Sequence, residues 1–103
     1  MVIKWSNFAK ENLQEFNQYS RLSSPKTYIK ELVNTVNILE DNPRAGKKIK
    51  YSNDTEIRQL IYKMHRIIYR ISNEEIHILT VLNSNQDLQT TIKFLEKHFN
   101  RLH

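Results

Sequence analysis

The chain has 103 residues and no cysteine, and 16 Lys and Arg against 11 Asp and Glu give a net charge of +5. This composition excludes a disulfide framework and thiolate chemistry, and the length predicts one domain over residues 1–103 with a modest core. With no signal pattern at the start and no apolar run near the roughly 18 residues of a membrane span, we expect a soluble cytoplasmic protein that makes no membrane contact, and the positive charge favours acidic partners.

The N-terminal residues predict a strand followed by a helix. Residues 2–5, Val-Ile-Lys-Trp, are short and apolar enough for an opening strand, and Ser6 is a candidate N-cap. A helix is expected over about 7–20, because apolar residues recur at helical spacing. The positions of this stripe are Phe8, Ala9, Leu13, Phe16 and Tyr19.

Pro25 predicts the start of a second helix, with Ser24 as its cap. This helix is expected to run to about residue 41, because Asn42 precedes Pro43 and is pushed out of the helical region. Two amphipathic helices joined by a tight link predict a helical hairpin that packs on a sheet. The apolar positions of the second helix are Ile29, Leu32, Val33, Val36 and Leu39.

A basic stretch follows Gly46, the only glycine, which closes the turn after the second helix. Residues 47–51 are compatible with a short strand. The cationic residues form the densest positive cluster in the sequence: Arg44, Lys47, Lys48 and Lys50. Two interpretations stay open. The lysines either protect a solvated sheet edge from aggregation or bind an acidic partner, such as nucleic acid or an acidic protein segment.

Residues 56–83 predict three consecutive antiparallel strands, because they are rich in β-branched and aromatic residues and are broken by short polar segments. A two-residue turn at Asn73 and Glu74 would pair Ser72 with Glu75. Alternation then places one set of side chains on the core, namely Ile67, Tyr69, Ile71, Ile76, Ile78 and Thr80. The opposite face, partly open to water, carries Arg66, Ile68, Arg70, His77, Leu79 and Val81.

The turn before these strands decides where Arg58 points. A two-residue loop at Lys63 and Met64 places Arg58 on the core side near the sheet edge, and one more loop residue turns it to the other side. A C-terminal helix is expected from near Gln86. It either completes the core or covers the sheet in one functional state only. Its apolar positions are Leu88, Ile92, Leu95 and Phe99.

The predicted fold class is therefore α+β, with an N-terminal strand, a two-helix hairpin, an antiparallel β-meander and a C-terminal helix. This order, with its particular residues, resembles the RelE/ParE superfamily of bacterial type II toxin-antitoxin toxins, also called the plasmid stabilisation protein family. The resemblance covers about residues 2–88. It is carried by residues 3–6, Ala9, Leu13, Leu39, Pro43, Gly46, residues 57–60, 65–71 and 78–82, and Gln86 with Asp87.

The resemblance implies a toxin with a twisted antiparallel sheet that inhibits bacterial growth until a cognate antitoxin wraps around it. Some members of the superfamily cut messenger RNA on the ribosome, and ParE-like members inhibit DNA gyrase. It also implies that the toxin-antitoxin complex binds operator DNA through the antitoxin. No cofactor and no metal is expected.

In the ribonuclease branch, cations bind the scissile phosphate while other groups move protons. Arg66 matches the arginine that the resemblance places at this phosphate, and His65 stands beside it. Lys48 and Lys50 lie in the region where RelE-type members carry catalytic lysines. These residues are catalytic candidates only if the protein is a nuclease. Three further histidines are more often structural than catalytic: His77, His98 and His103.

The end of the last strand departs from the ribonuclease pattern. Ribonuclease members have a tyrosine or histidine there or just beyond, whereas this chain has Asn83 and Asn85 before Gln86, and these side chains cannot act as general acids or bases. We therefore expect ParE-like inhibition of DNA gyrase by binding. The binding candidates are Arg58, Arg70, Lys47, Asn83, Asn85 and Gln86. The alternatives are a ribosome-dependent mRNA endoribonuclease and a non-toxic member that only binds antitoxin.

Overall fold

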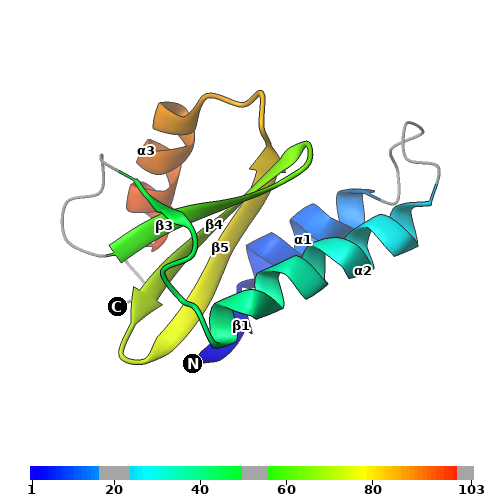
Figure 1. Ribbon diagram of the computed structural model, residues 1–103. Helices are drawn as coiled ribbons and strands as arrows, with labels where there is room; N and C mark the ends of the chain where they lie inside the picture. The colour runs from blue at the N-terminus through cyan, green and yellow to red at the C-terminus, as the bar shows by residue number, and fades with distance from the viewer. Residues whose placement is uncertain (17–23, 50–55, 100–103) are drawn as a thin grey trace.

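The computed structural model describes residues 1–16, 24–49 and 56–99. Figure 1 shows a sheet with helices α1 and α2 on one side and helix α3 on the other. None of the helices in the described ranges is long and apolar enough to cross a membrane. The elements in chain order are β1 (Val2–Trp5), α1 (Asn7–Glu15), α2 (Pro25–Val36), the 3-10 helix η2 (Asn37–Glu40), β2 (Lys47–Lys48), β3 (Glu56–Tyr62), β4 (His65–Ser72), β5 (Glu75–Asn83) and α3 (Leu88–Phe99).

The strands form one five-stranded sheet in the order β1-β5-β4-β3-β2. Strands β2 to β5 pair antiparallel, which confirms the predicted meander and the short strand before it. The resemblance implied an antiparallel sheet. This is wrong for one pair of strands, because β1 lies parallel to β5. Parallel neighbours need a long connection, and here every other element except α3 lies between β1 and β5 in the chain.

Both turns of the meander are two residues long, which confirms the prediction for the second turn and decides the first, whose length the sequence left open. Tyr62 pairs with His65 across the first turn, and Ser72 pairs with Glu75 across the second. Positive φ angles occur in these turns, at Lys63 (50°), Asn73 (51°) and Glu74 (63°). Such angles match the right-handed twist of the strands that the turns connect.

The structure confirms one of the two predicted helix caps. The Ser6 hydroxyl accepts a hydrogen bond of 3.0 Å from the Ala9 N–H, which confirms the predicted N-cap. Ser24 precedes α2 but makes no side-chain cap bond, because its hydroxyl donates to Thr27 Oγ1 instead. The chain stays helical to Glu40, one residue short of the expected end, with the last turn in 3-10 form. The predicted extension of the first helix over residues 17–20 lies outside the described residues.

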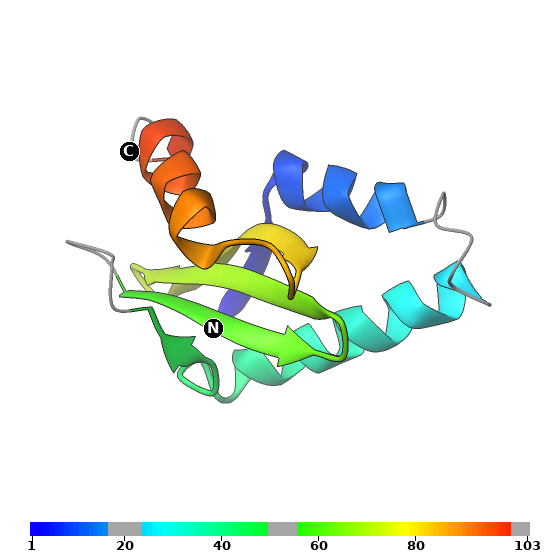
Figure 2. The same ribbon diagram turned by 90° about the horizontal axis from the view of Figure 1, so that it is seen from above.

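Each face of the sheet carries its own hydrophobic cluster. The first packs α1 and α2 on the sheet and contains Ala9, Phe16, Tyr28, Leu32, Val36, Leu39, Ile67, Tyr69, Ile76, Ile78 and Val81. The second packs α3 on the opposite face and contains Ile49, Ile57, Ile68, Leu79, Leu82, Ile92 and Leu95. In this structure α3 completes the core, and Figure 2 shows it lying across the sheet from α2.

A β-bulge in β5 corrects the predicted faces. Tyr69 pairs with Ile78, but the next residue back on β4, Ile68, pairs with Thr80, so Leu79 is the extra residue. The extra residue shifts the alternation by one position. Val81 therefore joins the core with α1 and α2, and the prediction that Thr80 belonged there and Val81 to the other face was wrong.

Candidate functional site

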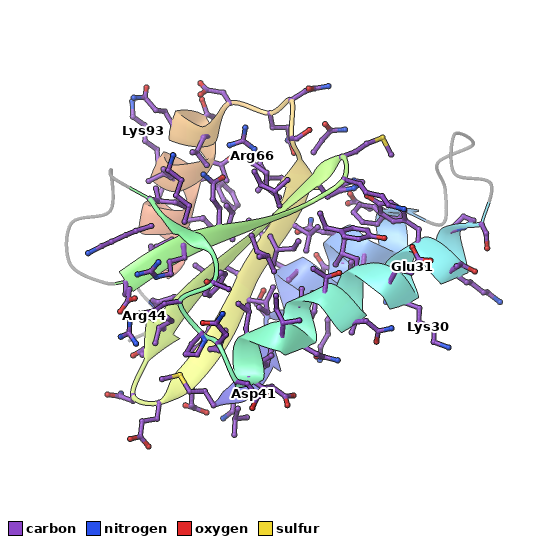
Figure 3. The ribbon with its side chains drawn as sticks, viewed as in Figure 1. Lys30, Glu31, Asp41, Arg44, Arg66 and Lys93 are labelled. Carbon is purple, nitrogen blue, oxygen red and sulfur yellow. The ribbon has the colours of Figure 1, made fainter. Side chains whose placement is uncertain are left out.

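Arg66 lies on the face of the sheet that carries α3, opposite Ile61 of β3 and Leu82 of β5 (Figure 3). Its Nη1 donates to Gln59 Oε1 at 3.1 Å, and its Nη2 donates to the Ser84 carbonyl oxygen at 3.2 Å. Its Nε is buried without a hydrogen-bond partner. Within residues 1–16, 24–49 and 56–99, no carboxylate forms an ion pair with this guanidinium.

Two large apolar side chains are exposed at this end of the sheet: Ile61, which pairs with Arg66, and Met64, which lies two residues before Arg66 in the chain. Ile61 is 59% exposed, and Met64, in the turn between β3 and β4, is 49% exposed. The Ser84 N–H donates to the Met64 carbonyl oxygen at 2.8 Å, which joins this turn to the end of β5. We call Gln59, Ile61, Met64, Arg66 and Ser84 the Arg66 patch. These five residues lie at the end of the α3 face of the sheet, beside Leu82, and none of them belongs to the second hydrophobic cluster.

The predicted binding residues at the end of β5 form a tight turn. The Asn83 N–H donates to Gln86 Oε1 at 3.0 Å, and the Asn85 N–H donates to Asn83 Oδ1 at 3.0 Å. The amide oxygens of Asn83 and Gln86 are thus engaged by backbone, although all three residues are exposed. Asp87 then caps the start of α3, because its Oδ1 accepts a hydrogen bond of 3.1 Å from the Gln89 N–H.

His65 lies on the opposite face from Arg66, among the residues that pack under α1 and α2. It is 4% exposed, its Nδ1 is 2.7 Å from the Tyr28 hydroxyl oxygen, and its ring centre is 4.2 Å from that of Phe16. Burial lowers the pKa of His65 below its ordinary range. The structure therefore does not bring His65 and Arg66 together, because adjacent strand residues point to opposite faces.

A cavity of about 400 Å³ lies between α1, the end of β5 and α3. His65 lines it, and the rings of Phe8 and Phe94, 5.5 Å apart, bridge α1 and α3 at its wall. Asn12 also lines it, and its Oδ1 accepts from the Thr80 hydroxyl at 2.7 Å and from a backbone N–H of β5 at 3.0 Å. Asn12 thus covers the part of the β5 edge that β1 does not reach.

Sequence reasoning missed Asn12, although the sequence contained a signal for it. Asn12 stands three residues after Ala9 and four before Phe16, so it lies on the apolar side of α1. A polar residue in that position needs a buried partner, and the unpaired edge of β5 supplies one.

The predicted cationic residues fall into different environments. Lys47 and Lys48 are exposed on β2 and pair with Gln59 and Arg58 across the edge of the sheet. Lys50 lies outside the described residues. Arg70 is half-buried on the same face as Arg66, opposite His77 of β5. The structure therefore places Arg66 and Arg70 on one face, as predicted, with Lys47 at its margin, whereas Lys48, opposite Arg58, is on the α2 side.

Arg58 lies on the α2 side of the sheet, as a two-residue turn required, and its contacts are structural. Its Nε donates to Glu56 Oε2 at 2.8 Å, and its Nη1 donates to the Gly46 carbonyl oxygen at 2.7 Å. Arg44 donates to Glu56 Oε1 at 2.9 Å. The hydrogen bonds from Arg44 and Arg58 hold the pKa of Glu56 below its usual range. This cluster fixes the loop before β2 to the sheet.

Gly46 is needed in this loop for close packing rather than for a positive φ angle. A Cβ atom at this position would lie 2.6 Å from the Gln59 carbonyl oxygen and 2.6 Å from the Tyr69 hydroxyl oxygen.

No group of three or more potential metal-ligating side chains occurs in the part of the chain that the structure describes.

Comparison with known proteins identifies a family. The sequence profile described as the ParE toxin of the type II toxin-antitoxin system, parDE, matches residues 3–88. No curated protein sequence matches this chain.

Solved structures share the fold at low sequence identity. The chromosomal ParDE toxin-antitoxin system from P. aeruginosa is 22% identical with a TM-score of 0.65, covering 81% of this chain and 95% of that chain. The archaeal RelE-RelB complex from Pyrococcus horikoshii is 19% identical with a TM-score of 0.64, covering 84% and 97%. The isolated E. coli RelE toxin is 14% identical with a TM-score of 0.57, covering 93% and 97%.

Proposed function

The chain belongs to the ParE toxin family of type II toxin-antitoxin systems, and from this premise we propose that it inhibits bacterial growth by binding DNA gyrase. A cognate antitoxin is its regulatory partner, as the paired toxin and antitoxin names of the similar complexes suggest. As a binding inhibitor, the protein breaks no covalent bond of its target.

The observation that carries this proposal is the surroundings of Arg66. Cleavage of RNA through the 2′-hydroxyl needs groups that take up and release protons beside the phosphate-binding cation. The hydrogen-bond partners of Arg66 are the Gln59 amide oxygen and the Ser84 carbonyl oxygen, which do neither. His65 is buried on the other face against Tyr28. Within the described ranges, Arg66 thus makes no hydrogen bond to a group that acts as an acid or a base.

The second candidate is a ribosome-dependent endoribonuclease. Its support is the buried, unpartnered Nε of Arg66 together with exposed Lys47 at the margin of the same face. In that function Arg66 would hold the scissile phosphate, and a lysine would replace the usual acid. A third candidate is a non-toxic chain that only binds antitoxin, with Asn83 and Asn85 in place of functional residues.

Two measurements test the proposal. The first is pulse labelling with thymidine and methionine in a bacterial host minutes after the chain is induced, and the second is supercoiling of relaxed plasmid by purified DNA gyrase with added protein. We expect thymidine incorporation to fall first and supercoiling to stop. An earlier fall in methionine incorporation with cleaved messenger RNA would replace this proposal with the endoribonuclease, and normal growth would favour the non-toxic candidate.

A further inference from the structure

We propose that the Arg66 patch is the surface that docks on the target, and that it takes a segment of a protein in which a carboxylate stands next to an apolar side chain. This inference rests on the proposed function, with DNA gyrase as the target. It adds which face of the toxin makes the contact and which chemistry it recognises.

The first argument is charge. Arg66 is half-buried, and the described residues supply it with two neutral oxygen acceptors and no carboxylate. By contrast, Arg44 and Arg58 share Glu56, and Lys4 pairs with Glu75 at 2.7 Å. A guanidinium that is partly removed from water and lacks a counter-charge gains most from an incoming carboxylate, because the screening by solvent is reduced there.

The second argument is the apolar neighbours. Ile61 lies directly across from Arg66 on the same face, because paired residues of an antiparallel ladder share a face. Ile61 and Met64 are among the most exposed large apolar side chains described. Arginine is enriched among protein-binding hot spots, and arginine and methionine are both enriched in protein interfaces. Gln59 and Ser84 hold the guanidinium in place with neutral groups.

The same composition favours a protein over RNA. Surfaces that bind a phosphate backbone gather several cations or aromatic rings. The five residues of the Arg66 patch include one cation and no aromatic ring. Lys47, which pairs with Gln59, and Arg70 lie further along the same face, and Lys63 in the adjacent turn lies near the Tyr28 and Tyr62 rings and Glu31. An RNA contact is therefore the competing result that the test must distinguish.

The test compares four variants of the full chain in the gyrase supercoiling assay. Arg66→Ala removes the charge, and Ile61→Asp places a carboxylate opposite Arg66, where it would pair with the guanidinium and repel an acidic partner. Val2→Asp is the matched control for Ile61→Asp, because Val2 is 60% exposed at the far edge of the sheet. Lys30→Ala is the charge control, from an exposed position on α2 (Figure 3). Circular dichroism verifies that each variant is folded.

We expect Arg66→Ala and Ile61→Asp to raise the concentration for half-inhibition about tenfold or more, the size of a hot-spot loss, while both controls stay within about twofold. Wild-type inhibition by folded Ile61→Asp would overturn the inference and leave the proposed function standing. If Ile61→Asp loses antitoxin binding but still inhibits gyrase, the inference is also overturned and the proposed function still stands. A wild-type chain that cleaves messenger RNA and leaves gyrase active would overturn both.

Discussion

The hydroxyl of Tyr69 joins the centre of the sheet to the loop that precedes β2. Tyr69 is fully buried, donates to the Pro43 carbonyl oxygen at 2.8 Å and accepts from the Gly46 N–H at 2.9 Å. Burial raises the pKa of Tyr69, so the hydroxyl stays protonated and can do both. The variant Tyr69→Phe keeps the ring and removes both bonds, leaving a buried N–H and a half-buried carbonyl without their partner.

The magnitude follows from the cost of unsatisfied buried groups. An unpaired buried N–H costs about 1–3 kcal/mol, and the Pro43 carbonyl, which water reaches more easily, adds little. We therefore expect Tyr69→Phe to lower the free energy of unfolding by about 1–3 kcal/mol. For a chain of this length that loss corresponds to a fall in Tm of about 5–20 °C.

Urea unfolding followed by circular dichroism measures this loss. The control is Tyr62→Phe, because the Tyr62 hydroxyl donates at 2.7 Å to the exposed carboxylate of Glu31 and its removal leaves no buried group unpaired. Tyr69→Phe should unfold at a clearly lower urea concentration than Tyr62→Phe. Equal midpoints for the two variants would refute the reasoning that this hydroxyl holds the loop on the sheet.

Two further predictions concern α1 and the buried histidine. Asn12→Ala removes the acceptor of two groups at the β5 edge and should lower the free energy of unfolding by about 1–2 kcal/mol in urea, whereas the exposed substitution Gln14→Ala should not. Because burial depresses the pKa of His65 in the folded state, the unfolded chain takes up this proton first, so stability should fall as pH drops below about 6.5. Urea midpoints at pH 7.5 and 5.5 measure this slope, and its survival in a folded His65→Asn variant would contradict the assignment.

Local features of the fold were readable from the sequence because they depend on residues close together in the chain. The Asn73 and Glu74 turn requires positive φ, and this fixed the pairing of Ser72 with Glu75. The two-residue first turn then placed Arg58 on the α2 side, as expected for that loop length. Each of these outcomes rests on backbone sterics and side-chain alternation within a few residues, which tertiary packing leaves unchanged here.

The site depended more on contacts between distant residues. The alternation of β4 put Arg66 and His65 on opposite faces, but only the packed structure assigns them their partners, Gln59 and Ser84 for the arginine and Tyr28 for the histidine. The partners come from another strand, a loop and a helix. The spacing of residues within β4 does not specify which side chains from other elements become these partners.

By itself, the sequence determined the order of the elements, the second turn of the meander and the family resemblance, since hydrophobic period and turn chemistry act over short stretches of chain. Only the tertiary structure decided that β1 runs parallel to β5, that Leu79 forms a bulge and that α3 covers the second face. These features arise when separate apolar surfaces are buried together. The energy of that burial depends on shape and partners across the whole molecule, which a local pattern does not contain.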